Sequence, residues 1–326
     1  MNSTATKVIG MSSGDYVPTI HFSVVILTYN RQACLRHVLS DLATLRYPSI
    51  EVIVVDNNSE IPATVLQSEF PNFKFLKSNA NIGTAARNIG FMQASGEYIV
   101  SLDDDLYGLT DQSLEALYRY FQDPKLGAVC FKVIEEATGT LTNWVHHRPA
   151  EVFENRSFPT YEITEGAVAF RKEAVARAGY YPETFFISHE GPDLAFRILD
   201  LGYEIVYVPD VSVVHSYSPH GRASWRNYYY DTRNTFWLVF RNCPFGFGSR
   251  LLIRQTGAMF IYSCRDGFFR WWLKGVYDGL LGLPEAIQHR RKMGRETMKR
   301  IWAMESDRPG LMYLIRRRLF QRGIKL

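Results

Sequence analysis

Apolar runs alternate with a helical pattern over the first third of the chain, and this alternation constrains the fold most strongly. The runs "FSVVILTY" at 22–29 and "IEVIVVD" at 50–56 are rich in β-branched residues, as strands buried on both faces are. Between them, apolar residues over 35–45 recur at three- and four-residue spacing, which predicts an amphipathic helix. A helix at about 84–94 and a strand at 97–103 repeat the alternation. We therefore predict an α/β fold with a Rossmann-like, doubly wound and mostly parallel sheet.

The carboxyl ends of the predicted strands concentrate polar residues. Thr28, Tyr29 and Asn30 end the first strand, Asp56 ends the second, and three consecutive aspartates at 103–105 end the run "YIVSLDDD". Like charges repel, and such a triplet persists where a cation or hydroxyl donors share the site. Ligands of doubly wound sheets bind beyond the carboxyl ends of the strands. We therefore interpret these residues as one binding crevice rather than as solvated turns.

The remainder of the chain divides into a second α/β portion and a helical end. An irregular stretch at 135–162 precedes a helix expected from about Pro192 to Leu201 and strands that end at His215. The loop after 217 leads into a helical C-terminal third. The expected parts are an N-terminal extension at 1–20, an α/β domain at 21–220 and a helical, basic and aromatic region at 221–326.

The basic charge of the chain is concentrated at its end. The net charge is +4, but residues 285–326 hold twelve Lys and Arg against four Asp and Glu, a local charge of 12 − 4 = +8, which leaves −4 for the remainder. This asymmetry argues against a nucleic-acid-binding protein and favours a tail that meets an anionic surface such as a membrane. Nearby aromatic residues could lie at the lipid headgroups or, equally, form the core of a helical subdomain. They are Phe268, Phe269, Trp271, Trp272, Trp302 and Tyr313, near the basic triplets 290–292 and 316–318.

Neither a targeting segment nor a membrane span is expected from the sequence. The N-terminus lacks a cationic region followed by an apolar core, and no uncharged apolar stretch of ~18 residues occurs. We expect a cytoplasmic location, with peripheral contact to the inner membrane if the tail binds lipid. An oligomer is compatible with the sequence.

A set of segments, in this order and spacing, resembles the inverting glycosyltransferases of family 2, which have the GT-A fold. The segments are "SVVILTYNR", "VIVVDNNS", "NANIGTAARNIG", "SLDDD", "EGAVAFRKEAV", "HEGPDLAFRI" and "VPDVSVVH". They span roughly 22–215, and the tail has a looser likeness to bacterial, rhamnosyltransferase-like members that modify cell-surface glycans. The resemblance implies transfer of a sugar, with inversion, from a nucleotide-diphosphate donor to a glycan or lipid-linked acceptor, with Mn²⁺ or Mg²⁺ as cofactor.

The resemblance also implies roles along the first half of the sheet. Asp56 would accept a hydrogen bond from a base N–H, although a turn role in "DNNS" is the alternative. Of Asp103 and Asp105, one would reach the ribose and the other a metal ion, since D-x-D spacing in an extended segment places both carboxylates on one side. His215 would complete the metal shell. The other expected donor-binding residues are Thr28, Tyr29, Asn30, Arg31, Asn81, Gly83, Arg87 and Asp104.

Inversion requires a base, and the sequence offers two candidates. A carboxylate must take the proton of the acceptor hydroxyl on the face opposite the leaving group. Many relatives read E-D-x-D or D-x-x-D where this chain reads Glu190-Gly191-Pro192-Asp193. Glu190 is the preferred candidate, because Asp193 is expected in the first helical turn, where an acid also has a capping role. The remaining alternative is that both acids only start the helix.

Other functions fit the sequence less well. A sugar-nucleotide nucleotidyltransferase would normally have a glycine-rich loop after the first strand to hold a triphosphate, and here the loop reads "TYNRQACL". A non-catalytic protein that binds glycans or membranes would leave the D-x-D, acid and histidine set unexplained.

Overall fold

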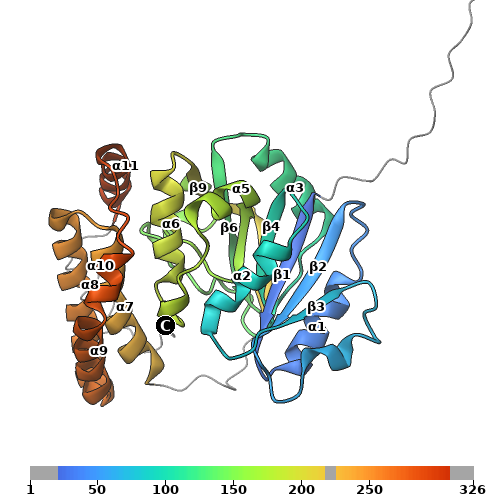
Figure 1. The fold of residues 1–326 in the computed structure, drawn as a ribbon. Helices are drawn as coiled ribbons and strands as arrows, with labels where there is room; N and C mark the ends of the chain where they lie inside the picture. The colour runs from blue at the N-terminus through green and yellow to red at the C-terminus, as the bar shows by residue number, and fades with distance from the viewer. Residues whose placement is uncertain (1–20, 217–224, 309–326) are drawn as a thin grey trace, which may run out of the picture.

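The structure of the protein is a computed structural model that describes residues 21–216 and 225–308 (Figure 1). The predicted N-terminal extension, the loop after 217, Tyr313 and the triplet 316–318 lie outside the described residues.

In the described residues, nine strands form one sheet in the order β3-β2-β1-β4-β8-β6-β9-β5, with β7 paired to β9. The strands are β1 (Phe22–Thr28), β2 (Ile50–Asp56), β3 (Lys74–Lys77), β4 (Tyr98–Asp103), β5 (Leu106–Tyr107), β6 (Leu126–Glu135), β7 (Phe158–Pro159), β8 (Ala167–Arg171) and β9 (Glu204–His215). Strands β3, β2, β1 and β4 are parallel to one another, β8 runs antiparallel to β4 and β6, and β6 is parallel to β9. The predicted mostly parallel sheet is confirmed, and the carboxyl ends of β1, β2 and β4 meet at one edge.

Helices cover both faces of the sheet (Figure 1). They are α1 (Gln32–Leu42), α2 (Arg87–Gln93), α3 (Asp111–Phe121), α4 (Ala150–Phe153), α5 (Lys172–Ala178) and α6 (Glu190–Asp200), with the 3₁₀ turns η1 (Ala63–Leu66), η2 (Gly83–Ala86) and η3 (Glu183–Phe185). Leu39 of α1 and Leu117 of α3 belong to the apolar cluster on one face of the sheet. Phe91 of α2, Val175 of α5 and Leu194 of α6 belong to the cluster on the other face. The alternating side chains of the buried strands supply both clusters, as expected for a doubly wound sheet.

Helix α6 begins at Glu190, two residues earlier than predicted. Both candidate bases, Glu190 and Asp193, therefore lie in its first turn. At the other end, Gly202 follows the helix with a φ of 91°. This left-handed conformation ends a helix at little cost only for glycine.

The C-terminal helices share a core with the sheet domain. They are α7 (Arg226–Asn242), α8 (Phe245–Asp266), α9 (Phe269–Leu281), α10 (Leu283–Gln288) and α11 (Arg295–Glu305). Leu238 of α7, Phe247 of α8 and Ile301 of α11 belong to the same apolar cluster as Phe196 of α6. The helical region is therefore packed onto the α/β domain through α6, beside which α7 lies in Figure 1.

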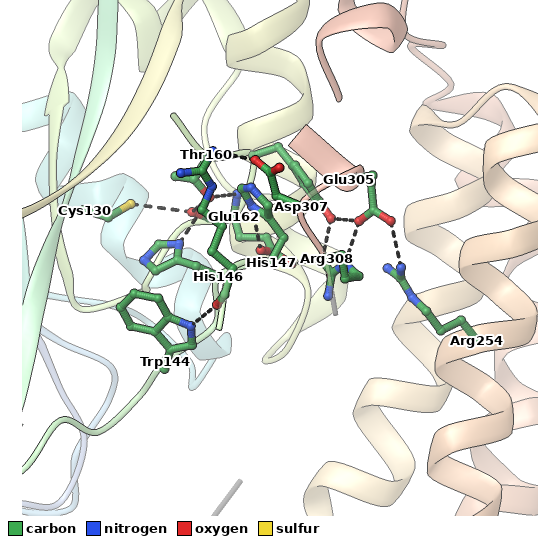
Figure 2. A network of polar contacts seen from close by, with 12 residues as sticks. Cys130, Trp144, His146, His147, Thr160, Glu162, Arg254, Glu305, Asp307 and Arg308 are labelled. Carbon is green, nitrogen blue, oxygen red and sulfur yellow. Dashed lines mark hydrogen bonds and ion pairs between the residues drawn. The ribbon is translucent and has the colours of Figure 1, made fainter. Parts of the chain in front are cut away.

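The stretch 135–162 is less irregular than predicted, because it contains α4 and β7. A polar network attaches its end to the C-terminal helices (Figure 2). Oε1 of Glu162 accepts a hydrogen bond from Arg308 at 2.7 Å, and Oε2 lies 3.7 Å from Nδ1 of His147. Arg308 also donates to Glu305, which in turn accepts from Arg254 at 3.0 Å. Burial would raise the pKa of Glu162, but Arg308 and His147 outweigh it and lower this pKa to about 2.

Candidate active site

Arg31 and Thr28 hold two of the three consecutive aspartates. Nη1 of Arg31 donates to Asp104 at 2.7 Å, and its Nη2 donates to Asp105 at 2.5 Å. Oγ1 of Thr28, at the end of β1, donates to the other oxygen of Asp104 at 2.7 Å. Because these residues follow neighbouring parallel strands, the sheet brings the first and fourth segments of the resemblance together.

The two aspartates differ in pKa although they share Arg31. Burial raises the pKa of Asp104 to about 7, against the opposing effects of Arg31 and Thr28. Burial also acts on Asp105, but the contact with His215 and the charge of Arg31 prevail and lower its pKa to about 2. Asp104 is only 3% exposed, so it holds Arg31 and Thr28 in place and is not open to a nucleotide.

Asp103 points to a different partner, so the spacing argument for D-x-D was wrong. Nη2 of Arg87 donates to Asp103, and Nη1 donates to the carbonyl of Leu102 at 2.8 Å. The chain turns after Asp103 instead of continuing as a strand, so Asp104 and Asp105 share one arginine and Asp103 has another. Arg87 was expected to reach the nucleotide, but it is only 2% exposed, and its guanidinium orients the Asp103 carboxylate.

His215 lies beside Asp105 because β5 pairs with β9. The pairing aligns Leu106 with His215, and the backbone N–H of Ser216 donates to the carbonyl of Asp105 at 2.9 Å. Nε2 of His215 is then 3.3 Å from Oδ2 of Asp105. The predicted association of Asp105 with His215 is therefore present in the structure.

The donor set at this edge fits a divalent cation only together with other ligands. In the described part of the chain, no group of three or more His, Cys, Asp or Glu side chains is arranged to hold a metal ion. Asp105 and His215 offer one oxygen and one nitrogen ligand, and the Asp103 side chain is 39% exposed at the same edge. Protein-bound Mg²⁺ commonly uses one or two carboxylates and completes its shell with substrate phosphates and water. These residues suit that kind of site.

Asp56 makes the turn contacts that the alternative interpretation predicted. Its two carboxylate oxygens accept hydrogen bonds from the backbone N–H groups of Ser59 at 2.7 Å and Ala63 at 2.8 Å, and the residue is 2% exposed. Asn30, with a φ of 55°, accepts from Glu60 N–H through its side chain at 2.8 Å. These bonds fix the loops after β1 and β2. Tyr29 is 42% exposed at the rim.

Asn57, which the sequence analysis did not single out, organises the loop that carries Asn81 and Gly83. Its Nδ2 donates to Oδ1 of Asn81 at 2.9 Å and to the carbonyl of Gly83 at 3.1 Å. A Cβ at Gly83, where φ is 68°, would lie 1.8 Å from the carbonyl oxygen of Phe186. Thr84 N–H donates to that oxygen at 2.7 Å. Gly83 thus allows the donor-side loop to contact the loop that precedes α6.

The loop before α6 has a costly backbone conformation. Three of the four residues at 186–189 have φ values of 66°, 78° and 64° although none is glycine, and such conformations persist only when the surroundings enforce them. Asn234 of α7, which is 0% exposed, provides that enforcement. Its Nδ2 donates at 2.7–3.0 Å to the carbonyls of Phe185, Ile187 and Ser188. Helix α7 therefore fixes the position of Glu190.

Glu190 and Asp193 have opposite environments. Glu190 is 4% exposed, its Oε2 has no hydrogen-bond partner among the described residues, and burial raises its pKa. Asp193 is 0% exposed, and both of its oxygens are used: Oδ2 by Arg197, and Oδ1 by Arg241 and Asn242. Burial would raise the pKa of Asp193, but the two arginines lower it. Asp193 joins α6 to α7, whereas Glu190 retains one carboxylate oxygen without a partner among the described residues.

Glu165 is a site residue that the sequence analysis did not identify. It lies just before β8, and its Oε1 accepts a hydrogen bond from Gly191 N–H at 2.7 Å. The next residue, Gly166, has a φ of 77°, and a Cβ there would lie 2.3 Å from the Asp103 carboxyl carbon. A continuous path of contacts therefore runs from Asp103 through the segment 165–166 to the start of α6.

The comparison with protein families gives this arrangement a context. Residues 23–179 match the model of "Glycosyl transferase family 2". Over these residues, the chain belongs to glycosyltransferase family 2. The family 2 segment contains β1 to β8 and the aspartate cluster, whereas α6, β9 and the C-terminal helices follow it.

Bacterial proteins are among the relatives of this chain. "Poly-beta-1,6-N-acetyl-D-glucosamine synthase" of Staphylococcus epidermidis is 33% identical over 111 residues, which are 33% of this chain and 27% of that protein. "O-antigen chain rhamnosyltransferase RfbN" of Salmonella typhimurium is 21% identical over 221 residues, 64% of this chain and 70% of that protein. The chain thus spans about a quarter of the synthase.

Solved structures extend the likeness beyond the family 2 segment. S. aureus TarS 1–349 has a TM-score of 0.58 with 18% identity, and the match covers 88% of each chain. "Mannosyltransferase PcManGT from Pyrobaculum calidifontis in complex with GDP-Man and Mn2+" has a TM-score of 0.51 with 21% identity, over 90% of this chain and 77% of that one. The predicted GT-A architecture with C-terminal helices is confirmed by this likeness.

Three site residues, Glu165, Asn57 and Asn234, were not predicted from the sequence, and only the first two stand in the segments that carry the resemblance. Glu165 stands in the quoted segment "EGAVAF", and the missing side chain at Gly191 was the available hint that another residue fills that space. Asn57 belongs to the quoted "DNNS". Asn234 lies in α7, far from these motifs in sequence, and only the packing of α7 on the loop at 186–189 identifies it.

Proposed function

We propose that this protein transfers a sugar from a nucleotide-diphosphate donor to an acceptor hydroxyl, with inversion and with the help of a divalent cation. The observation that carries the proposal is the path of contacts that joins the Asp103 to Asp105 cluster to Glu190, whose Oε2 has no hydrogen-bond partner among the described residues. Charged donor-side groups and a buried proton acceptor thereby share one edge of a family 2 fold. The likeness to the mannosyltransferase solved with GDP-Man and Mn²⁺ and to TarS solved with UDP-GlcNAc supports the donor class and the metal.

Donor binding would use the carboxyl edge of β1, β2 and β4. Asp105 and His215 would hold the cation, which when bound neutralises the leaving diphosphate. Arg31 lies between these ligands and Asp104, where its charge adds to the positive potential around the phosphates. The nucleoside would lie against the loops built on Asp56 and Asn81.

Glu190 would act on the acceptor. As the acceptor oxygen forms a bond to the anomeric carbon, the bond from that carbon to the phosphate oxygen breaks, and the diphosphate leaves with the electron pair. The hydroxyl proton passes to the carboxylate. Burial raises the pKa of Glu190 and so makes it a better base than an exposed glutamate. Asp193 would not compete for this role, because two arginines hold it.

The acceptor class that we propose is a bacterial glycan or a lipid-linked glycan, presented at the cytoplasmic face of the inner membrane. Large apolar side chains are exposed on the C-terminal helices, among them Phe245 (90%), Ile253 (73%), Leu273 (52%), Tyr277 (62%) and Leu281 (61%). Apolar patches rimmed by basic residues are typical of surfaces that lie on anionic lipid. None of the described helices is long and apolar enough to cross a bilayer.

Some of the aromatic residues that suggested a membrane contact form a helical core, and others are exposed. Phe268, Trp271 and Trp272 pack against the small core of Tyr228, Ala258, Met259 and Tyr262, as the subdomain alternative predicted. Phe269 is 44% exposed and Trp302 is 40% exposed. The proposed lipid contact therefore rests on the exposed side chains of α8 to α10 rather than on the tryptophan pair.

Sedimentation with liposomes of graded anionic lipid content tests the membrane contact. Binding should rise with the anionic fraction and fall with salt. Leu273→Ser combined with Leu281→Ser should weaken it, whereas Ile61→Ser, an exposed apolar residue of the sheet domain, should not. Equal recovery in the supernatant at every composition would contradict the contact.

A thermal-shift screen of sugar nucleotides with Mn²⁺ or Mg²⁺ tests the proposed reaction. A cognate donor should raise Tm by mass action, since it binds only the folded state. The stabilising donor is then used in a transfer assay, in which NMR of the product should show inverted anomeric stereochemistry. A retained configuration, or full activity after chelation, would contradict the inverting, metal-dependent reaction.

A further inference from the structure

Glu165 occupies the space that a side chain at position 191 would need. A Cβ added to Gly191 would lie 1.9 Å from Oε1 of Glu165 and 2.6 Å from its carboxyl carbon. Gly191 lies in the first turn of α6 and has no left-handed φ, so its backbone would accept any L-residue. The glycine is therefore required by the neighbouring carboxylate and not by its own conformation.

The Glu165 carboxylate is held at the start of α6 next to Glu190. It accepts the Gly191 N–H, and Gly191 is the residue after Glu190 in the chain. The charged and titratable groups that act on the two acids are Asp103 on β4, Arg87 on α2, Asp231 on α7, Tyr181 and Cys130. In the described part of the chain, neither glutamate forms an ion pair with any of these groups. Desolvation and the neighbouring Glu190 raise the pKa of Glu165 to about 8, and burial raises that of Glu190.

We propose that Glu165 is a second acid of the active site, and that Glu165 and Glu190 act as one pair that takes up the acceptor proton. This inference rests on the proposed glycosyl transfer. The pair enters the reaction with one proton and one negative charge, because two neighbouring carboxylates, one of them buried, cannot both ionise readily. The acceptor hydroxyl loses its proton to the ionised member as its oxygen bonds to the anomeric carbon. The pair then holds two protons and releases one to solvent before the next turnover.

The position of Glu165 explains why this chain can lack an acid at position 191. A carboxylate from the segment before β8 fills the place beside Glu190 that a side chain on α6 would otherwise fill. Glu165 is partly exposed and adjoins Gly166, which contacts Asp103. Glu190 is buried. The more exposed member of the pair therefore adjoins the segment that contacts Asp103.

A reciprocal exchange of the acid between the two segments tests the proposal. Glu165→Ala should lower kcat by ~10²-fold, the lower part of the range for loss of a general base, with the donor KM nearly unchanged. Gly191→Asp alone should lower both kcat and Tm, because its Cβ would collide with Glu165. The double variant Glu165→Ala with Gly191→Asp should regain at least ~10-fold in kcat over Glu165→Ala, since a carboxylate again stands beside Glu190.

Two controls distinguish the effect of an ionisable carboxylate from the effect of side-chain volume at this position. Glu165→Ala with Gly191→Asn restores bulk without an ionisable group and should remain as slow as Glu165→Ala. Glu173→Gln removes an exposed carboxylate of α5 that pairs with Arg177 and should leave kcat unchanged. Glu165→Gln combined with Glu190→Gln should be no slower than the slower of the two single variants, as expected of residues that act as a unit.

The outcomes distinguish this proposal from the proposed function. If the wild type transfers no sugar from any nucleotide sugar, glycosyl transfer itself fails, and the acid pair fails with it. If the wild type is active and Glu165→Gln retains kcat within about 2-fold, the acid role is overturned while glycosyl transfer stands. A folded Glu165→Ala/Gly191→Asp variant that is as slow as its Asn counterpart would also overturn it.

Discussion

The acids on the two sides of the crevice are held in opposite ways. On the donor side, Asp103 is paired with Arg87, and Asp104 and Asp105 are paired with Arg31. On the α6 side, Glu165 contacts a backbone N–H, and Glu190 has an oxygen without a partner in the described residues. Arg31 and His215 lower the pKa of Asp105 although burial raises that of its neighbour Asp104, whereas burial raises the pKa values of both Glu165 and Glu190. In the proposed reaction, the same functional group would thereby carry charge at Asp105 and accept a proton at Glu190.

Asp193 shows that closeness to the loop at 186–189 does not decide whether a carboxylate is paired with arginine. It lies three residues after Glu190 in the same helical turn, yet Arg197 and Arg241 hold both of its oxygens. Its environment is that of the donor-side acids, although its function is to attach α6 to α7. The distinction therefore comes from the partners of each carboxylate and not from the element that carries it.

The largest expected effect is loss of the donor-side charge that lies beside His215. Asp105→Ala should remove about 4 kcal/mol of transition-state stabilisation, a ~10³-fold loss of kcat/KM, because the cation and Arg31 both lose a ligand. Steady-state kinetics with and without a chelator measure it, and circular dichroism checks the fold. Normal turnover of this variant or of the chelated wild type would contradict the metal assignment.

The next effect concerns the proton acceptor. Glu190→Gln should lower kcat by ~10²-fold or more with donor affinity nearly unchanged, as expected for a base with few ground-state contacts. Asp193→Asn is the matched variant three residues away: it should lower Tm, because Arg197 and Arg241 would lose their charged partner, and reduce kcat less. A larger loss of kcat at Asp193, in folded protein, would reverse the assignment.

A smaller effect is expected from the support of the loop before α6. Asn234→Ala removes the donor that holds three carbonyls of the loop, so Glu190 should be less well placed and kcat should fall ~10-fold. Thr256→Ala changes a side chain of α8 that bonds only within its helix and serves as the control. Comparison of kcat with KM separates the two roles, and equal kcat in both variants would mean that the loop does not need Asn234.

The smallest effect is a pH dependence of stability. The pKa of Glu165 is raised to about 8, against about 4.3 in an unfolded chain. The folded state therefore retains a proton that the unfolded state loses, so this contribution to stability is fully present below about pH 4.3 and disappears as the pH rises toward 8. Glu165→Gln should remove this loss, so Tm of the variant should improve relative to wild type between pH 5 and 8. Parallel Tm curves in differential scanning fluorimetry would contradict a raised pKa.

The sequence by itself determined the sheet and the composition of its edge. Short β-branched apolar runs such as 22–29 and 50–56 are typical of strands covered on both faces, so the positions of Thr28, Asp56 and the aspartate triplet at one edge followed from the parallel order. The association of Asp105 with His215 followed from the family motifs. Helix ends were predicted to within two residues at α6, where Gly202 marks the stop.

Only the tertiary structure decided which acid has which partner. The D-x-D spacing suggested that Asp103 and Asp105 act together, but a turn after β4 gives them different arginines. Glu165 and Gly191 are twenty-six positions apart in the chain, and their contact exists because α6 packs on the face of the sheet to which β8 contributes Val168 and Phe170. The ionisation of a carboxylate depends on its burial and on charges within a few ångströms, and those distances are set by packing between segments that the sequence does not place side by side.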